Sequence, residues 1–135
     1  MQKVLAAILG AIVASAVFFL VAFVDNAVRP TPVELMDPAT PEAVAERVES
    51  TPVSKWLVVM FGLALGSFVG GITGAKVAGG KTVCVAISIG LLLTPWAGYT
   101  FYVVYPAVLW VPIGMLISVF LFSYLGGCVV RSHNK

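Results

Sequence analysis

The chain has 135 residues, of which 60% are hydrophobic and only 10% are charged, and its formal net charge is +2 at pH 7. A soluble domain of this size keeps roughly a quarter of its residues charged, so the composition excludes an ordinary water-soluble domain. The apolar residues are gathered into uncharged runs of the length that crosses a bilayer, about 20 residues each. Lipid is therefore the predicted solvent for most of the chain, and the mean hydropathy of +1.04 agrees with this.

The first uncharged run, Val4–Val24, predicts a membrane-spanning helix. Lys3, this run and the "ASA" at 14–16 also match a secretory signal peptide with a cleavage site. A cleavage region is normally polar, whereas this chain continues with the apolar "VFFLVAFV" after the "ASA". We therefore expect a first helix that is retained.

Residues 25–55 form the only sizeable soluble segment and carry all 6 acidic residues of the chain. The first part, "RPTPVELMDPATP", is rich in proline and is expected to be extended or to turn. The following "TPEAVAERVES" predicts a short amphipathic helix with Thr40 as N-cap, Pro41 in the first turn, and Val44 and Val48 on one face. We expect this helix to cover the outer end of the bundle, and an acidic docking surface for a basic partner is the alternative.

The second predicted span is Trp56–Ala75, and more than half of the 13 glycines lie in "GLALGSFVGGITGAKVAGGKT" at 62–82. The final "GKT" resembles the end of a phosphate-binding loop, G-x-x-x-x-G-K-[ST]. However, Ala75 stands at the first position of that motif, the preceding run has the length of a helix, and no acid that could hold Mg²⁺ follows Glu49. The sequence therefore argues against a nucleotide site.

The second predicted helix has a small residue at every fourth position: Gly62, Gly66, Gly70 and Gly74. Residues four apart share one face of a helix, and such small-residue faces let helix backbones approach closely in lipid. Similar pairs occur in the first and fourth predicted helices: Gly10 with Ala14, and Gly114 with Ser118. We expect the partner of the glycine face to lie within the chain, with a second copy of the chain as the alternative.

No charged residue occurs between Lys81 and Arg131, so this stretch is expected to hold two further spans, divided by Pro95 and Pro106. The expected spans are 82–97 and 107–130. An alternative for the third span is that Pro95 kinks a helix that continues to Val104. The overall prediction is an all-α integral membrane four-helix bundle forming a single membrane domain.

The charge distribution predicts the orientation of this bundle. If both termini share one side, that side holds basic residues and no acids, and the 25–55 segment with its acids lies on the other. The basic residues are Lys3, Lys76, Lys81, Arg131 and Lys135. The positive-inside rule then places both termini in the cytoplasm and the 25–55 segment in the periplasm, as for a bacterial inner-membrane protein. The tryptophans at 56, 96 and 110 fall near the outer ends of three spans, where an aromatic belt is expected.

Reactive groups are scarce in the predicted spans. No ionisable residue lies at a helix centre, and the only histidine, His133, lies in the C-terminal tail. Cys84 and Cys128 are expected to be reduced packing residues and not a disulfide or a metal site. Asp25 and Asn26 are the best candidate pair for a membrane enzyme, but we expect them to cap or end the first helix. We therefore expect no catalytic residue, cofactor, metal, nucleotide or nucleic-acid partner.

The polar side chains inside the predicted spans are hydroxyls: Ser15, Ser67, Thr73, Ser88, Thr94, Ser118 and Ser123. Such hydroxyls usually bond back to the preceding helical turn or to a neighbouring helix. They are expected to do so here, and they do not form a convincing polar stripe that could line a pathway.

Several motifs follow one another along the chain: the proline-rich "RPTPVELMDPATPEAVAERVESTP", then "LALGSFVGG", "YPAVLW" and "YLGG". This order resembles a family of small four-span bacterial inner-membrane proteins with no assigned function. The resemblance implies the four-span fold and a membrane location, but no reaction. Members often carry Glu and His in the last turn of the first helix, where this chain has Ala22 and Asn26.

Three classes of function are compatible with these features. The first, which we predict, is a structural or accessory bundle in the lipid bilayer that packs through its glycine-lined helix within a homo-oligomer or a larger membrane complex. The second is a subunit of a small channel or transporter, which would have to oligomerise because four helices leave little room for a pathway. The third is a membrane enzyme, for which the chain offers no convincing reactive group.

Overall fold

The computed structural model describes residues 1–30, 42, 46, 49–79, 82–104 and 110–133. Four long helices account for most of them: α1 (Gln2–Val28), α3 (Val53–Val77), α4 (Thr82–Val104) and α5 (Trp110–His133). No β-strand occurs among the residues that the structure describes, and the prediction of an all-α fold with four long helices is confirmed.

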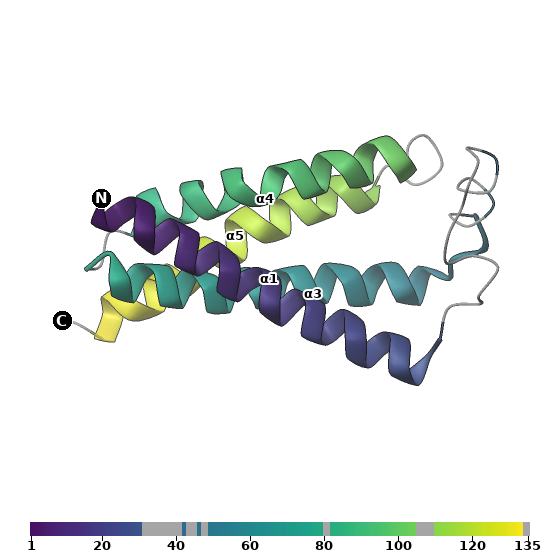
Figure 1. Cartoon of the computed structure of the whole chain (residues 1–135), viewed down its shortest axis with the longest axis horizontal. Helices are drawn as coiled ribbons and strands as arrows, with labels where there is room; N and C mark the ends of the chain where they lie inside the picture. The colour runs from purple at the N-terminus through teal and green to yellow at the C-terminus, as the bar shows by residue number, and fades with distance from the viewer. Residues whose placement is uncertain (31–41, 43–45, 47–48, 80–81, 105–109, 134–135) are drawn as a thin grey trace.

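Successive helices run in opposite directions, so both chain termini lie at one end of the bundle (Figure 1). We call this the inner end, where α1 begins at Gln2 and α3 ends at Val77, and the opposite end the outer end. α3 is the central helix, because its most extensive contacts are with α1 on one side and α5 on the other. α4 packs mainly on α5 and touches α1 and α3 less.

Three of the described helices are long and apolar enough to cross a membrane: α1, α3 and the Trp110–Ser132 portion of α5. In α4 the comparable apolar stretch within the described residues is the shorter Val83–Pro95. The helices extend beyond the uncharged runs on which the prediction was based, because α1 continues past Val24 to Val28 and α3 begins before Trp56, at Val53. Helix formation therefore does not stop where the apolar run stops.

The third helix does not end at residue 97, where its prediction ended. α4 continues through Pro95 to Val104, as the alternative had it. Proline removes one backbone hydrogen bond from a helix, but it does not end a helix whose other backbone groups remain paired. The start of the fourth span at residue 107 lies outside the described residues, and α5 is helical from Trp110 to His133, three residues beyond the predicted end.

The segment between α1 and α3 is described only in part. Glu42, Glu46, Glu49 and Ser50 are helical. Thr40, Pro41, Val44 and Val48, on which the predicted amphipathic helix depends, lie outside the described residues. At the inner end, α3 stops at Val77, and Gly79 adopts a left-handed φ of +66°, the conformation that favours glycine after a helix.

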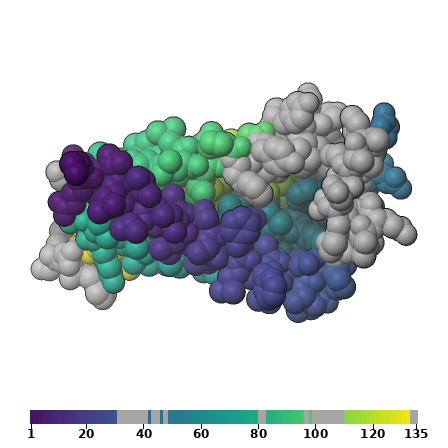
Figure 2. All heavy atoms as spheres, viewed as in Figure 1, coloured from purple at the N-terminus to yellow at the C-terminus, as the bar shows by residue number. Residues whose placement is uncertain are grey.

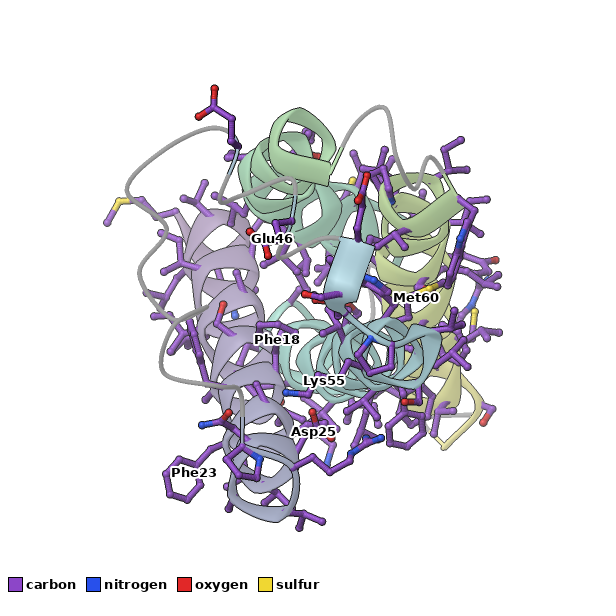
Figure 3. The ribbon with its side chains drawn as sticks, turned by 90° about the vertical axis from the view of Figure 1, so that its right-hand side faces the viewer. Phe18, Phe23, Asp25, Glu46, Lys55 and Met60 are labelled. Atoms are coloured by element: carbon purple, nitrogen blue, oxygen red, sulfur yellow. The ribbon has the colours of Figure 1, made fainter. Side chains whose placement is uncertain are left out.

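A small apolar core formed by Leu63, Val111, Met115 and Val119 lies between α3 and α5, in the outer half of the bundle. Much of the remaining apolar surface is exposed. On α1, which lies uncovered on the face shown in Figure 2, Phe19, Leu20 and Phe23 are 60%, 62% and 73% exposed. Seen from the outer end, Phe23 points away from the bundle whereas Phe18 points toward its interior (Figure 3). Apolar surface of this extent indicates contact with lipid or with another protein.

Candidate functional site

The glycine face of α3 lies against α1. A methyl group at Gly66 would meet the carbonyl oxygen of Ala14 at 2.5 Å, and one at Gly70 would collide with the carbonyl oxygen of Gly10. A methyl group at Gly74 would lie 3.1 Å from the carbonyl oxygen of Ala6. Real Cβ atoms essentially never come within 3.0 Å of another atom, so the two backbones touch at Gly66 and Gly70 only because these residues lack side chains. At Gly74 the nearest obstacle is a methyl carbon of Val85 on α4, at 2.6 Å.

The same contact can be followed from α1. A methyl group at Gly10 would meet the Gly70 carbonyl oxygen at 2.8 Å and Ile89 of α4 at 2.6 Å. Ala14 is 2% exposed and Ala6 is fully buried. At the inner end, the Gln2 side-chain amide donates to the Val77 carbonyl at 3.4 Å. The predicted site residues Gly66, Gly70, Gly74, Gly10 and Ala14 are thus brought together in one antiparallel contact.

Gly62 belongs to the same face but has a different neighbour. A methyl group there would meet Val21 side-chain carbons at 3.2 and 3.3 Å and the Phe18 ring at 3.4 Å, with no backbone atom among these nearest contacts. On α1, small residues lie opposite three of the glycines of α3: Ala6, Gly10 and Ala14. The next residue of α1 at the same four-residue spacing is Phe18, which lies opposite Gly62. The large ring keeps α1 away from α3, and the two helices diverge toward the outer end (Figure 1).

A second close contact, which the sequence reasoning did not anticipate, joins α3 to α5. Methyl groups at Gly71 and Gly126 would collide with the backbone carbonyls of Ser123 and Phe68, respectively. Gly114, which the sequence paired with Ser118 as a small-residue site on the fourth helix, does not take part in this backbone contact. It faces the flexible end of the Met60 side chain instead. The available signal was a second row of small residues four apart, Ser67, Gly71 and Ala75, on the adjoining face of α3.

Three of the seven hydroxyls in the predicted spans bond back to their own helix, as expected. Thr73, Ser88 and Thr94 each donate to a carbonyl one turn earlier, that of Val69 at 3.0 Å, Cys84 at 2.8 Å and Gly90 at 2.8 Å. Ser67 and Ser123 differ, because each is 1% exposed and its hydroxyl has no hydrogen-bond partner among the described residues. An unsatisfied buried hydroxyl costs about 1–3 kcal/mol, so both positions require an explanation.

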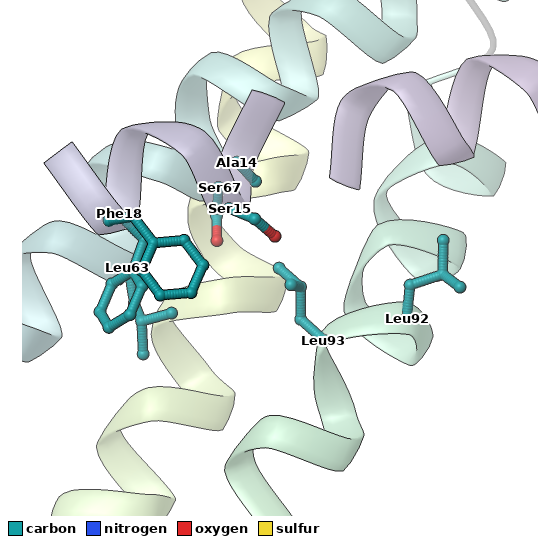
Figure 4. Close-up of a pocket in the computed structure, with 8 residues that line it drawn as sticks. Ala14, Ser15, Phe18, Leu63, Ser67, Leu92 and Leu93 are labelled. Carbon is teal, nitrogen blue, oxygen red and sulfur yellow. The ribbon is translucent and has the colours of Figure 1, made fainter. Parts of the chain in front are cut away.

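Ser67 is one of the residues that line a cavity of about 210 Å³ between α1, α3 and α4 (Figure 4), although its hydroxyl oxygen is itself covered. The residues that line it are Ala14, Ser15, Phe18, Phe19, Leu63, Ser67, Leu92 and Leu93. The lining is apolar except for the two serines. The cavity begins beside Phe18, where α1 leaves α3.

The outer ends of α1 and α3 are joined by polar contacts. The Arg29 guanidinium donates to the Asp25 carboxylate at 3.0 Å and to the Ser54 hydroxyl at 3.2 Å. Asp25 and Asn26 lie in the last turn of α1, where the Asp25 carbonyl accepts a hydrogen bond from the backbone N–H of Arg29 at 2.8 Å, and the helix itself ends at Val28. Pro30 disfavours helical geometry at Arg29, which explains this end point. Beside this contact, a wide and mainly apolar groove of about 690 Å³ separates α1 from α3.

Cys84 and Cys128 are free cysteines, and Cys84 is exposed on α4. Within the described part of the chain, no group of three or more His, Cys, Asp and Glu side chains could hold a metal ion. Comparisons of the whole chain with protein-family models, with curated proteins and with solved structures found no match.

Proposed function

We propose that the chain is a four-span integral membrane protein that serves as a structural or accessory bundle, with α3 as its central packing helix. The observation that supports this most directly is the backbone contact of α3 with both neighbours, at Gly70 against Gly10 and at Gly71 against Ser123. Close backbone contact through small residues is the usual way in which helices associate in lipid. Apolar side chains gain little there by exchanging lipid chains for another helix, because both surroundings are apolar.

The same contacts restrict how the protein associates with others. Because α1 covers the glycine face, a second copy of the chain cannot use that face without displacing α1. Association with another copy or with a larger membrane complex would therefore use the exposed apolar surfaces, such as Ile113 and Ile117 of α5, which are 48% and 59% exposed. This assigns the glycine face to internal packing.

A bacterial inner membrane with both termini in the cytoplasm is the proposed location. Both termini lie at the inner end of the bundle (Figure 1), and Lys3, Lys76 and Arg131 occur near the inner ends of α1, α3 and α5. The proposed orientation follows from the positive-inside rule applied to these residues. A channel or transporter subunit is less well supported, because the hydroxyls of Thr73, Ser88 and Thr94 are engaged by their own helices.

Cysteine labelling in cells tests insertion and orientation. In a background with Cys84→Ala and Cys128→Ala, we expect Ser50→Cys to react with a membrane-impermeant maleimide in spheroplasts. Ser132→Cys is expected to react only after the membrane is permeabilised. Equal labelling of both cysteines in intact spheroplasts, or labelling of neither after permeabilisation, would contradict the proposed topology.

Gentle extraction from the native membrane followed by native mass spectrometry tests the accessory role. The expected result is a complex with another membrane protein or a homo-oligomer of defined size. Cross-links from such a complex should map to the exposed faces of α1, α4 or α5 and not to Gly66 or Gly70 of α3. A chain that remains monomeric under all gentle conditions would contradict the accessory role but would leave the internal packing intact.

A further inference from the structure

We propose that the wide groove between the outer ends of α1 and α3 binds a phosphatidylethanolamine molecule, with its headgroup at Asp25 and Arg29 and one acyl chain between the helices. This proposal rests on membrane insertion, as proposed above, but not on the accessory role. The first observation is the groove itself, whose volume of about 690 Å³ falls within the roughly 300–1,000 Å³ of small-molecule sites.

The groove has one polar end, formed by Asp25 and Arg29. Seen from the outer end, Asp25 lies on the side of α1 that faces α3 (Figure 3). The Arg29 and Asp25 side chains are 43% and 15% exposed, so a molecule in the groove can reach both. The charged groups that face the groove are therefore a guanidinium and a carboxylate, placed side by side.

The guanidinium retains hydrogen-bonding capacity for a phosphate. Of its five N–H groups, Nε and one terminal nitrogen each donate one bond to Asp25, and the other terminal nitrogen donates one to Ser54. Each terminal nitrogen thus keeps one N–H that has no partner among the described residues. Hydrogen bonds from arginine to phosphate oxygens are charge-assisted and are stronger than those between neutral groups.

The carboxylate determines which phospholipid fits best. Oδ1 of Asp25 accepts both bonds from Arg29, which leaves Oδ2 without a partner among the described residues. A primary ammonium has three N–H donors and matches this oxygen, whereas the methylated ammonium of a choline headgroup has none. An anionic headgroup without a cation would place its phosphate beside the carboxylate with nothing to offset the repulsion. Phosphatidylethanolamine carries both charges that the groove complements.

The depth of these residues agrees with the position of a headgroup. The uncharged run from Val4 to Val24 has its midpoint at Ala14. At 1.5 Å per residue, Asp25 and Arg29 follow this midpoint by roughly 16 Å and 22 Å along the chain. A bilayer extends about 15 Å from its midplane to the edge of the hydrocarbon and about 20–22 Å to the end of the headgroups. The polar end of the groove therefore lies at the level of the headgroups.

The rest of the groove suits an acyl chain. Its apolar lining consists of Leu20, Val21, Val24 and Val28 of α1 and of Val58 and Phe61 of α3. Leu20 and Phe61 are 62% and 61% exposed, so the groove is open along its length to the proposed lipid phase. Because the two helices diverge toward the outer end (Figure 1), a lipid enters sideways from the bilayer. Its chain then extends from Arg29 toward Leu20, over roughly 14 Å at 1.5 Å per residue.

Photolabelling of the full chain in nanodiscs of phosphatidylcholine tests the proposal. The probe is a phosphatidylethanolamine that carries a diazirine on one acyl chain. We expect saturable labelling of the peptides that contain Val24, Val58 or Phe61. Unlabelled phosphatidylethanolamine in the same bilayer should suppress this labelling. Phosphatidylglycerol and diacylglycerol should suppress it about threefold to tenfold less, because each lacks one of the two charged groups.

Three variants examine the headgroup contacts. Arg29→Gln should weaken labelling of the groove by about threefold to tenfold, whereas the matched Arg131→Gln at the inner end should not. Ser54→Ala removes the contact of Arg29 with α3 but keeps the guanidinium, so labelling should be retained. Asp25→Asn leaves a positive site, and phosphatidylglycerol should then compete at least as well as phosphatidylethanolamine.

A fourth variant examines the acyl chain. Val24→Trp should abolish saturable labelling of the groove, because the larger side chain fills it. Phe23→Trp is the matched control, since Phe23 points away from the bundle (Figure 3). Circular dichroism and thermal unfolding of each variant establish that it is folded.

Several outcomes would overturn the proposal. Labelling that spreads evenly over all exposed faces means that the groove binds no particular lipid. Labelling of those faces but not of the groove means that another part of the chain or a partner protein covers it. Equal suppression by diacylglycerol removes the role of the phosphate, and equal suppression by phosphatidylglycerol removes that of the ammonium. Unchanged labelling of Arg29→Gln removes the role of the guanidinium. None of these results depends on whether a protein partner is found, and the cysteine labelling described above tests insertion separately.

Discussion

The inner and outer halves of the α1–α3 pair differ, although the same row of glycines runs through both. In the inner half, Gly66 and Gly70 face small residues of α1, and backbone lies against backbone. In the outer half, Gly62 faces Val21 and Phe18, and the helices separate. A glycine row therefore permits close approach, but the residue on the partner helix decides whether the approach occurs.

This difference also determines where open space remains between α1 and α3. In the inner half, small residues place the helix axes close together. Phe18 separates the helices, the cavity lined by Ala14, Ser15 and Ser67 lies beside this point, and the wide groove lies farther toward the outer end. The α1–α3 pair is therefore tight in its inner half and open at its outer end.

The largest expected effect is that of Gly70→Ala in the tight half. Its methyl group would meet the Gly10 carbonyl oxygen and the Ala14 Cβ, so we expect the free energy of unfolding to fall by about 3 kcal/mol, at the upper end of overpacking costs. The measurement is SDS-induced unfolding in mixed micelles followed by circular dichroism. Gly98→Ala on α4 is the control, because no atom lies within 4 Å of its added methyl group. Equal stability of the two variants would contradict the backbone contact.

Ser123→Ala tests the buried hydroxyl beside the other tight contact, between α3 and α5. The Ser123 hydroxyl is buried and has no partner among the described residues, so its removal should raise the free energy of unfolding by about 1 kcal/mol. The same unfolding assay measures it. Ser88→Ala, which removes a hydroxyl that bonds to its own helix, should change stability by a smaller amount. A loss of stability in Ser123→Ala would show that the hydroxyl has a partner.

Gly62→Ala is the direct counterpart of Gly70→Ala on the same face. Its methyl group meets only the side chains of Val21 and Phe18 at 3.2 Å or more, and the small shift of Val21 is offset by the helix propensity of alanine. We expect a change within about 0.5 kcal/mol, since alanine gains up to about 1 kcal/mol over glycine in a helix. A loss as large as that of Gly70→Ala would mean that the two halves are equally tight.

The smallest expected effect is that of Arg29→Ala at the outer end. The Arg29 contacts to Asp25 and Ser54 are exposed, and exposed ion pairs contribute about 0–1 kcal/mol. We expect a change of a few tenths of a kcal/mol at low salt, which disappears at high salt because the charges are screened. A double-mutant cycle with Asp25→Asn isolates the pair. A coupling above about 1 kcal/mol would show that this contact holds the outer ends together.

Much of the fold could be read from local features of the sequence. The uncharged runs predicted the helices, because the length of an apolar segment is a property of the segment alone. Pro95 was harder to interpret, since a proline can end a helix or lie within one, and the outcome depends on whether the residues after it remain helical. The back-bonding of Thr73, Ser88 and Thr94 was predictable, because the donor and the acceptor belong to the same turn.

The sequence alone determined the all-α architecture and the small-residue face of the second helix. It also determined which segments between the apolar runs are basic and which are acidic. Each of these features depends on residues close together in the chain. Only the tertiary structure decided which helix covers each face of α3, that Gly126 and not Gly114 meets its backbone, and that α1 diverges at Phe18. The cavity beside Ser67 has the same origin. These features depend on which side chains meet across three helices, and no spacing within one helix contains that information.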